Sequence, residues 1–513
     1  MAYNYAKLGH LSPSKDPQYD IIVVGSGHNG LIAAAYLAKA GKKVLVIEKA
    51  SYPGGGVASL TMAEEGFTSE RHSAIHQMIL ANPLVTKDEL ELQSKYGLRY
   101  LPLEPAYAII FEDGVLPLYH DVERTVDTIT DFSNEAEGQA YLKFATLATK
   151  FVELSMPSMF VPPTTPVDLS AHPEIAQAVE FAAKNSSLEV VEQYFKTQQS
   201  KSPFSDSSRK YSWHTRRPQA QASWPTWLLV SYTNTEAHGG EVRLNTEVIK
   251  IVTENGRAIG VRTRAGEIRA RKAVVAQIHP HILDRLVDGL DPEVTIPAKE
   301  TRLSEYTLFV VHAAMESPLR FRAGGVANKV VMNTICPGSV ESLLKSYEEI
   351  DQGKIPEDLI IGASIITNAD QTRAPPGKSL LHAVVMVRAD NAEVGFHGWD
   401  AIKDEVTYKV FRYLSKYVED LTPDQIRGYH AVTPLDHEHD TSSFQRGDIC
   451  GLSMAFDQMG GSRPTLALAQ YRVPGVSGLY LAGPFMHPGG GVWGGGRPVA
   501  IRVLEDLGIK FKL

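Results

Sequence analysis

The sequence predicts an α/β protein, and three segments carry that prediction. Residues 20–48 have the pattern of a strand, a glycine turn, a helix and a second strand, which together form a βαβ unit. Residues 242–275 alternate short apolar runs with Asn-Gly and Ala-Gly turns, as in a β-meander. Residues 478–507 contain a short strand, a glycine-rich loop and a final helix. The first segment therefore sets the fold class, and the other two extend it.

The composition is that of an ordinary globular protein with a large core. The 513 residues are enough for about two to four domains, with 43% hydrophobic and 21% charged residues. The net charge of −8 argues against nucleic-acid binding, which needs a basic surplus to meet the phosphates. Two cysteines, Cys336 and Cys450, are too few for a disulfide framework or a zinc cluster and suit a reducing compartment.

Targeting signals are weak along the chain. Residues 1–19 lack the apolar run of a signal peptide, and no stretch approaches the roughly 18 apolar residues needed to cross a bilayer. The ending Lys510–Leu513 only loosely resembles a peroxisomal address. We therefore expect a soluble, cytoplasmic protein.

Each element of the βαβ unit has its own signal in the sequence. Ile21–Val24 and Val44–Ile47 are short apolar runs, as expected for buried parallel strands. Leu31–Ala40 between them is an alanine-rich helix, and Gly41 is placed to end it.

The rest of the chain alternates strand and helix signals. A hairpin is expected at residues 107–119, and helical spacing runs through Asn134–Leu154 and Ala171–Phe195. The meander strands are expected at Val248–Val252, Ala258–Val261 and Ala273–Val275. Further strands are expected at Leu308–Ala313, Leu359–Ile366, Leu380–Val387 and residues 478–483, and a last helix at Arg497–Leu507.

The glycine turn of the βαβ unit has the composition of a phosphate site. Gly25-Ser26-Gly27-His28-Asn29-Gly30 is a G-x-G-x-x-G between strand and helix, where glycines allow the turn, the approach of a pyrophosphate and close helix packing. The helix start supplies free N–H groups and the positive end of a dipole. Glu48 ends the second strand, where a carboxylate accepts bonds from ribose hydroxyls and repels a 2′-phosphate.

Two more glycine clusters favour FAD over NAD. Gly54, Gly55 and Gly56 follow Glu48 closely and let the chain pass beside a long, extended ligand. Residues 489–496 open the final helix, where bare N–H groups suit a pyrophosphate and the edge of a flavin ring. A plain loop would explain one such cluster, but three in one chain predict FAD.

These segments together resemble a known family, the phytoene desaturase-like flavoproteins. The likeness is to the branch with CrtO-type ketolases and pyridine nucleotide-disulfide oxidoreductase domain-containing proteins. It rests on Gly25–Gly30, Glu48, Gly54–Gly56, Gly256–Val261, Thr433–Asp436, Asp457–Met459, Arg463–Pro464, Tyr471–Pro474, Leu479–Ala500 and, within the last, His487–Gly494.

The resemblance implies a Rossmann-type FAD-binding domain of the glutathione reductase kind, with a β-meander, and a mixed-sheet and helical substrate domain. The first is expected at 1–80, 232–290 and 440–513, and the second at 81–231 and 291–439. The implied FAD contacts are Gly25, Ser26, Gly27, His28, Asn29, Gly30, Glu48, Lys49, Gly54, Gly55, Gly56, Val57, Val248, Gly483, Gly491, Val492 and Trp493.

Two departures from the family pattern fall near the site. Gly56-Val57 stands where an arginine is common, and the stretch before Gly239-Gly240 is short and lacks a Pro-x-Gly-Gly segment. The second departure lies where a substrate cavity is built, so the family's carotenoid substrates do not transfer directly.

Few side chains are expected to act as acids or bases, because the flavin carries the redox step. The candidates are His76, His487, Trp493 and Arg497, each with a structural alternative: a hydrogen-bonded histidine, a ring-face contact or an ion pair. No metal site is expected, because His437–Asp440 are adjacent residues in a turn-like stretch. The apolar, proline-broken segment at residues 156–163 is either the mouth of a substrate tunnel, a membrane contact or ordinary core.

Several functions remain open from the sequence. The first is an FAD-dependent oxidoreductase of dehydrogenase or desaturase type that takes hydride from a lipophilic or polycyclic small molecule. The second is a redox-neutral, flavin-dependent isomerase of double bonds. The third is a non-enzymatic lipid-binding chaperone of the GDP-dissociation-inhibitor type, or a silent flavoprotein scaffold. A homodimer and peripheral membrane contact are compatible with all of them.

Overall fold

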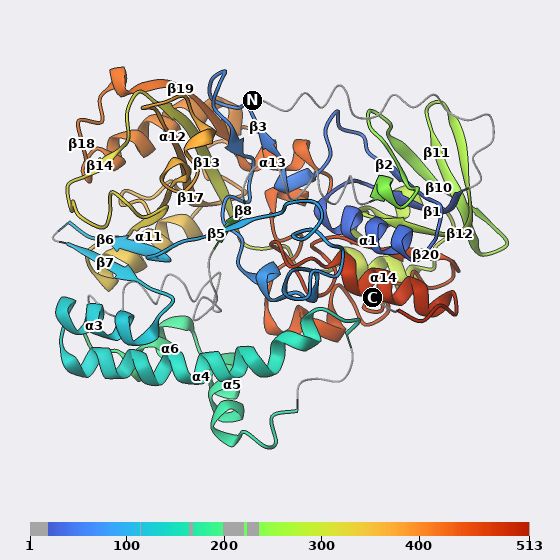
Figure 1. The fold of residues 1–513 in the computed structure, drawn as a ribbon, viewed down its shortest axis with the longest axis horizontal. Coiled ribbons are helices and arrows are strands. Elements are labelled where there is room, and N and C mark those ends of the chain that lie inside the picture. Colours follow the sequence, from blue (N-terminus) through green and yellow to red (C-terminus); the bar gives the residue numbers. More distant parts are fainter. Residues whose placement is uncertain (1–18, 113, 164–167, 198–219, 223–234, 512–513) are drawn as a thin grey trace.

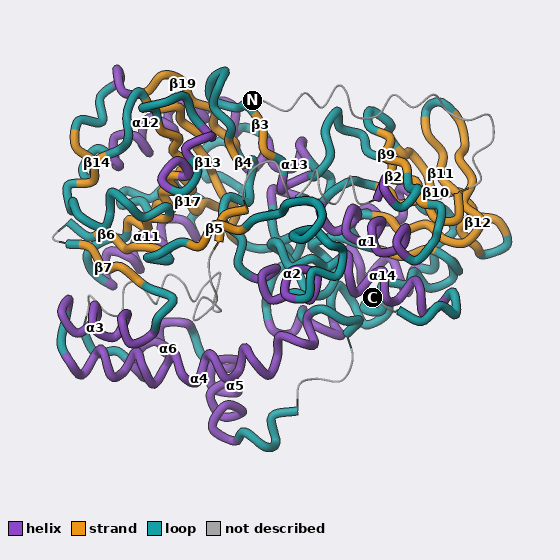
Figure 2. Tube along the Cα trace, in the orientation of Figure 1, coloured by secondary structure: helices purple, strands orange, loops and turns teal. Residues whose placement is uncertain are grey.

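The computed structural model describes residues 19–112, 114–163, 168–197, 220–222 and 235–511. The described chain contains two large sheets with helices around both (Figures 1 and 2). In the view of Figure 1 one sheet lies on the right and the other on the left, with the helices of residues 122–194 along the lower edge.

The first sheet contains the predicted βαβ unit and meander. Its strand order is β10-β11-β12-β1-β2-β9, with β20 beside β12. β1 pairs in parallel with β2 and β12, and β12 pairs in parallel with β20, whereas β10, β11 and β12 are antiparallel. The strands are β1 Tyr19–Val24, β2 Val44–Ile47, β9 Glu241–Arg243, β10 Val248–Glu254, β11 Arg257–Thr263, β12 Gly266–Ala276 and β20 Leu479–Leu481.

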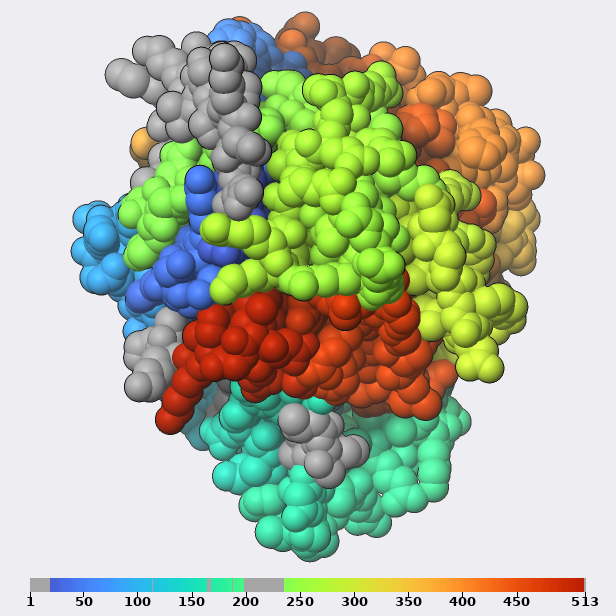
Figure 3. Space-filling view, turned by 90° about the vertical axis from the view of Figure 1, so that its right-hand side faces the viewer, coloured from blue at the N-terminus to red at the C-terminus, as the bar shows by residue number. Residues whose placement is uncertain are grey.

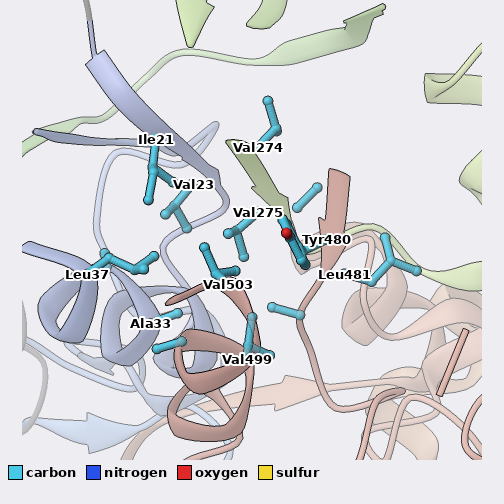
Figure 4. Close-up of a cluster of buried hydrophobic side chains, with 14 of the residues drawn as sticks. Ile21, Val23, Ala33, Leu37, Val274, Val275, Tyr480, Leu481, Val499 and Val503 are labelled. Atoms are coloured by element: carbon cyan, nitrogen blue, oxygen red, sulfur yellow. The ribbon is translucent and has the colours of Figure 1, made fainter. Parts of the chain in front are cut away.

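Two helices cover this sheet, one from each end of the chain. α1 (His28–Lys39) is buried on nearly every face, which its small alanines permit. α14 (Gly496–Asp506) packs so closely against α1 that a Cβ on Gly496 would lie 2.1 Å from the Asn29 carbonyl oxygen. Figure 4 shows side chains of β1, α1, β12, β20 and α14 meeting in one core, among them Ile21, Val23, Ala33, Leu37, Val274, Val275, Tyr480, Leu481, Val499 and Val503.

The C-terminal segment therefore completes the N-terminal unit. Figure 3 shows the red C-terminal segment lying directly against the green meander. The predicted Rossmann-type α/β fold is confirmed. Some bounds differ from the prediction. α1 begins at His28, inside the glycine turn, with Gly27 as its N-cap, and the last meander strand begins at Gly266 instead of Ala273. β9, at the start of the predicted meander, pairs in parallel with β2 instead.

The second sheet is mixed, in the order β19-β13-β17-β16-β15-β6-β7. Neighbouring strands are antiparallel except β15 and β6, which are parallel. The strands are β6 Tyr107–Ile110, β7 Val115–Leu118, β13 Tyr306–Met315, β15 Met332–Ile335, β16 Ile361–Ile365, β17 Ser379–Arg388 and β19 Ile426–Val432. α12 (Trp399–Leu414) packs its apolar side on one face of the sheet.

The helices at the lower edge are α3 Val122–Phe132, α4 Glu135–Met159, α5 Pro173–Lys184 and α6 Ser187–Tyr194. The single helical stretch predicted over Ala171–Phe195 is two helices. Ser186 forms a capping box with Glu189, which starts α6 anew.

The remaining helices and strands, most of them short, lie between these larger elements in the sequence. The helices are α2 Pro83–Thr86, α9 Leu283–Leu286, α10 Pro292–Lys299, α11 Val340–Asp351 and α13 Pro434–Asp440, and the strands are β3 Ser59–Leu60, β4 Ser69–Glu70, β5 Tyr100–Pro102, β8 Ala220–Ala222, β14 Arg320–Phe321 and β18 Val418–Glu419. The turn-like interpretation of His437–Asp440 was wrong, because Thr433 and Asp436 form a capping box that starts α13.

Each sheet draws its strands from separate stretches of the chain. The strands of the first lie within residues 19–47, 241–276 and 479–481, and those of the second within 107–118 and 306–432. The predicted domain ranges would keep each sheet whole, and their boundaries stay a prediction.

Candidate functional site

A cavity of about 1730 Å³ runs from the glycine turns of the first sheet to one face of the second. We call one end the nucleotide end, which is lined by Gly25, Gly27–Asn29, Glu48–Ala50, Tyr52, Gly55–Val57, Gln277 and Gly490–Trp493. We call the other end the sheet wall, which is lined by Tyr107, Ile109, Met332, Thr334, Val384 and Met386. The carboxyl ends of parallel strands β1, β2 and β12 meet at the nucleotide end, where α/β folds bind ligands.

The first glycine turn holds its shape around Gln277, the residue after β12. Gln277 Nε2 donates to the Gly25 carbonyl at 2.6 Å. Gly25 has φ +89°, and a Cβ on Gly30 would lie 2.3 Å from Gln277 Nε2 and 2.5 Å from the Gly25 oxygen. Glycine is therefore required at both positions. Gln277 was not predicted from the sequence, although its place after the last meander strand was a usable signal.

The start of α1 offers polar atoms that have no partner among the described residues. The helix has no side-chain cap and no acidic residue in its first turn, so its first N–H groups face the cavity end unpaired. Asn29 Oδ1 and His28 Nε2 are buried and have no hydrogen-bond partner among the described residues. Burial lowers the pKa of His28 to about 4. A neutral, donor-rich turn at a helix N-terminus fits a pyrophosphate.

Glu48 lines the cavity at the end of β2, and hydrogen bonds from Ser26 and Ala50 fix its carboxylate. Its carboxylate accepts from the Ser26 backbone N–H at 2.7 Å, the Ser26 hydroxyl at 2.9 Å and the Ala50 N–H at 2.9 Å. The remaining lone pairs of the carboxylate are available to ribose hydroxyls.

The second glycine cluster docks on the first. The Gly54 N–H donates to the Ser26 carbonyl at 2.8 Å. A Cβ on Gly55, whose φ is +57°, would lie 3.3 Å from the Gly27 Cα. This close contact of two backbones explains why the cluster follows Glu48 so soon.

The C-terminal loop closes the nucleotide end. Trp493 Nε1 donates to the Gly490 carbonyl at 2.6 Å, and Asn82 Nδ2 donates to the Trp493 carbonyl at 2.8 Å. The guanidinium of Arg463 is fully buried and donates to backbone carbonyls around the loop, among them that of Pro484 at 2.9 Å. Arg463 carried part of the family likeness without an assigned role, and Asn82 was not predicted.

Most of the predicted cofactor residues line this cavity: Gly25, Gly27, His28, Asn29, Glu48, Lys49, Gly55, Gly56, Val57, Val248, Gly491, Val492 and Trp493. Ser26, Gly30, Gly54 and Gly483 lie behind that surface. Gly483 adopts φ +143°, and a Cβ there would lie 2.5 Å from the Phe485 ring.

Among the residues predicted to be catalytic, Trp493 lines the cavity, and the other three are held elsewhere. His76 is buried, with Nδ1 3.4 Å from the Tyr100 hydroxyl. His487 Nε2 lies 3.1 Å from the Ser158 carbonyl. Burial lowers the pKa of both histidines to about 4. Arg497 pairs with Glu89 through two bonds of 2.6 and 2.7 Å, the structural alternative raised for it.

The sheet wall is made by alternation along the strands. On β17, His382, Val384 and Met386 face the cavity, whereas Leu381, Ala383 and Val385 pack into the core under α12. Successive strand residues point to opposite faces, so one strand builds both surfaces. Met332 and Thr334 of β15 add to the wall in the same way.

Helix α4 forms the facing side of the cavity, with Phe151, Val152, Met156 and Met159. Two residues of the proline-broken segment therefore line the cavity, as the tunnel interpretation requires. Contact of that segment with a membrane stays a prediction, as does a homodimer.

The described residues offer neither a metal centre nor a membrane span. They contain no group of three or more His, Cys, Asp or Glu residues placed to hold a metal ion. None of their helices is both long and apolar enough to span a bilayer.

The sequence and fold comparisons agree with this geometry. Residues 30–497 match the family model described as flavin containing amine oxidoreductase. A subunit of limonene dehydrogenase from Castellaniella defragrans is 26% identical over 97% of this chain and 96% of its own. Pyridine nucleotide-disulfide oxidoreductase domain-containing protein 2 of Rattus norvegicus is 25% identical over 96% and 94%. A 4,4′-diapophytoene desaturase of a Methylomonas species is 24% identical over 92% of both chains.

Solved structures show the same fold. An oxidoreductase from Methanosarcina mazei gives a TM-score of 0.56 at 16% identity, covering 95% of this chain and 99% of that one. A variant of putrescine oxidase gives 0.56 at 16% identity, covering 96% and 98%. The predicted resemblance to the phytoene desaturase-like proteins is confirmed, and FAD is the cofactor that the family and the site share.

Proposed function

The chain belongs to the family of flavin containing amine oxidoreductases, and we propose that it is a dehydrogenase of a lipophilic, uncharged small molecule. The reaction would remove hydrogen across a C–C or C–O bond. Family membership makes it an FAD-dependent oxidoreductase and gives no support to the lipid-chaperone alternative. The substrate class is the part that we propose.

The composition of the sheet wall is the observation that carries the proposal. From β6, β15, β16 and β17, no carboxylate, lysine or arginine lines the cavity among the described residues. The histidine beside the wall, His382, is kept neutral because burial lowers its pKa to about 4. A cationic amine would find no anionic partner on this wall, and burying an unpaired charge is costly. Limonene and diapophytoene, the compounds in the relatives' names, are hydrocarbons without charge.

In this proposal the residues of the nucleotide end hold FAD. Gly25–Gly30 would meet the pyrophosphate, Glu48 the ribose, Val248 the adenine, and Gly491–Trp493 the flavin side of the pyrophosphate. Bound FAD supplies hydride acceptance, which is the redox chemistry of the reaction. The protein's own contributions are orientation of the substrate between α4 and the sheet wall, exclusion of water by Met156 and Val384, and removal of a proton.

The test begins with the visible spectrum of the protein as purified. We expect bands near roughly 370 and 450 nm, the positions of an oxidised flavin that a protein only tunes. Under anaerobic conditions, limonene or 4,4′-diapophytoene should bleach the longer band, and putrescine should not. Bleaching by putrescine alone would replace the proposal with amine oxidation. Conversion of a substrate without net bleaching would favour the isomerase.

A matched pair of variants tests the wall itself. Met332→Glu adds a charge to the cavity and should lower the second-order rate of bleaching at least about tenfold, because the carboxylate must be desolvated. Met332→Leu keeps volume and polarity and should stay within about twofold. Equal rates for the two variants would show that the substrate does not contact the sheet wall.

A further inference from the structure

Three histidines stand in register on neighbouring strands of the second sheet. His312 of β13 is paired with His382 of β17 on one side and with His430 of β19 on the other. Directly paired residues of antiparallel strands project from the same face of a sheet. The rings of His312 and His382 lie 4.7 Å apart between centroids. A row of three imidazoles on one face of the sheet therefore crosses three strands, with His312 in the middle position.

The two ends of the row lie in different surroundings. His382 lines the cavity beside Val384 of the sheet wall. His312 is fully buried, on the opposite side of β13 from core residues Phe309, Val311 and Ala313. His430 is exposed on β19, the edge strand of the sheet. The row thus connects the cavity with solvent.

Three ring nitrogens of the row have no hydrogen-bond partner in the part of the chain that the structure describes. Neither ring nitrogen of His312 has a hydrogen-bond partner among the described residues, and neither does Nδ1 of His382. Buried polar groups are normally paired, so such atoms point to water or to a functional role. A neutral imidazole carries one donor and one acceptor nitrogen, so it takes up a proton on one side and releases it from the other.

Burial lowers the pKa of all three imidazoles of the row and is the main reason that they are neutral. Burial, followed by the other histidines, lowers the pKa of His312 well below its usual value. His72 and His437 face the row, with ring centroids 4.8 Å apart, and His437 Nε2 lies 3.0 Å from the Leu308 carbonyl. The charged groups acting on the row are Arg71, Lys403, Asp436 and Asp440, of which Lys403 pairs with Asp436 and Arg71 with Asp440.

We propose that His382, His312 and His430 form a path that carries a proton from the cavity to solvent. This inference rests on the proposed dehydrogenation, in which one C–H bond gives up hydride to FAD and the neighbouring C–H bond gives up a proton. The electron pair of the second bond becomes the new double bond. Its proton is taken by His382 and passed through His312, and one proton leaves His430 for water.

The first measurement is independent of FAD and substrate. In protein labelled with ¹⁵N-histidine, the ring N–H proton of His382 exchanges with water at a rate measurable by NMR. His312→Leu removes both ring nitrogens of the middle position and should slow that exchange at least about tenfold. His430→Gln, at an exposed position, should slow it severalfold and keeps the test available if His312→Leu fails to fold. His397→Gln, exposed and outside the row, is the control and should change nothing.

The second measurement is the bleaching of bound flavin by limonene or 4,4′-diapophytoene. His312→Leu should slow it about 100-fold, the usual size of a proton-transfer contribution. Free imidazole in the buffer should restore part of the rate in His430→Gln, because a mobile base replaces the exposed end. An exchange rate unchanged in His312→Leu would overturn the path, whatever the bleaching shows. Slowed exchange in a protein that no lipophilic compound bleaches would keep the path and sink the proposed dehydrogenation instead.

Discussion

The two ends of the cavity are built from different parts of the polypeptide. The nucleotide end is made mainly of backbone, since glycines at 25, 27, 54 and 55 let two turns touch and leave N–H groups exposed to a ligand. The sheet wall is made of side chains that alternate along strands, such as Val384 and Met386. Most substitutions leave a surface made of backbone unchanged, so it keeps binding the same ligand. A substitution in a wall made of side chains alters the shape and polarity of the wall, and with them the ligand that it binds. The cofactor is therefore common to the family, and the substrate is not.

The largest loss of stability is expected from the ion pair between Arg497 and Glu89, which lies between the two ends of the cavity. Arg497 of α14 binds Glu89 through two hydrogen bonds and donates to the Phe160 carbonyl at 2.8 Å, at the end of the helix that faces the sheet wall. Arg497→Met leaves the buried Glu89 carboxylate without its cationic partner, with only the Tyr36 hydroxyl still donating to it, and should cost about 3–5 kcal/mol of unfolding free energy, measured by urea denaturation.

The double variant separates a structural role from a catalytic one. Arg497→Met combined with Glu89→Leu should recover most of the lost stability, because no uncompensated charge remains. If the double variant is stable but substrate no longer bleaches its flavin, Arg497 acts in catalysis, and its role is not only to hold the two ends of the cavity together.

The next effect is a loss of unfolding free energy in acid, caused by His487 close to the nucleotide end. The pKa of His487 is lowered to about 4 by burial, next to the Ser158 carbonyl and Arg463. The unfolded chain therefore binds a proton at this position between about pH 6.5 and pH 4, whereas the folded chain does not. Stability should fall as the pH falls through that window.

His487→Leu should reduce that slope by up to about 1.4 kcal/mol per pH unit, measured as urea midpoints across the window. Leu466→Gln, at an exposed site without a titrating group, is the control. An identical slope in His487→Leu and the parent protein would mean that this ring is already charged when folded.

A smaller effect is expected from one methyl group at the nucleotide end. Gly30→Ala places a Cβ 2.3 Å from Gln277 Nε2 and 2.5 Å from a backbone oxygen, which should cost about 1–3 kcal/mol and weaken FAD binding. Gly338→Ala meets nothing within 4 Å and should match the parent. Flavin fluorescence after dilution measures the affinity, and equal retention in both variants would contradict a pyrophosphate at this turn.

The smallest effect belongs to the sheet wall. A Cβ on Gly362 of β16 would lie 3.9 Å from the Val384 Cβ, so a larger residue fits there without strain but narrows the cavity. Gly362→Val should lower kcat/KM about tenfold for the longer 4,4′-diapophytoene and less for limonene, with FAD content unchanged. A uniform decrease for both compounds would indicate a disturbed fold instead of a narrowed site.

The sequence predicted the parts of the fold that are local in the chain. The βαβ unit, the hairpin at residues 107–118 and the meander each follow from short apolar runs and glycine turns. Their strands lie close to the predicted limits except β12, which begins at Gly266 instead of Ala273. α3, α11, α12 and β19 were not predicted. β19 was missed because its sequence lacks the apolar run of a buried strand. Only Ala431 and Val432 are buried along it, which is possible because β19 lies at the edge of the sheet.

The candidate site divides in the same way. Gly25, Glu48 and Gly55 were identified from spacing, because a phosphate turn needs neighbouring residues in one order. Gln277, Asn82 and the histidine row were not, because each matters only through a contact across more than 60 residues of sequence. His76 and Trp493 were equal candidates by position. Both are buried, and only the path of the cavity, which Trp493 lines and His76 does not, separates them.

The sequence by itself determined the dinucleotide unit, since a tight turn, a helix start and a strand-end carboxylate are local requirements of backbone geometry. Only the tertiary structure decided which strand faces form the sheet wall and which histidines meet on it. The pairing of β13, β17 and β19 joins residues 312, 382 and 430, and no short-range pattern encodes which strands become neighbours.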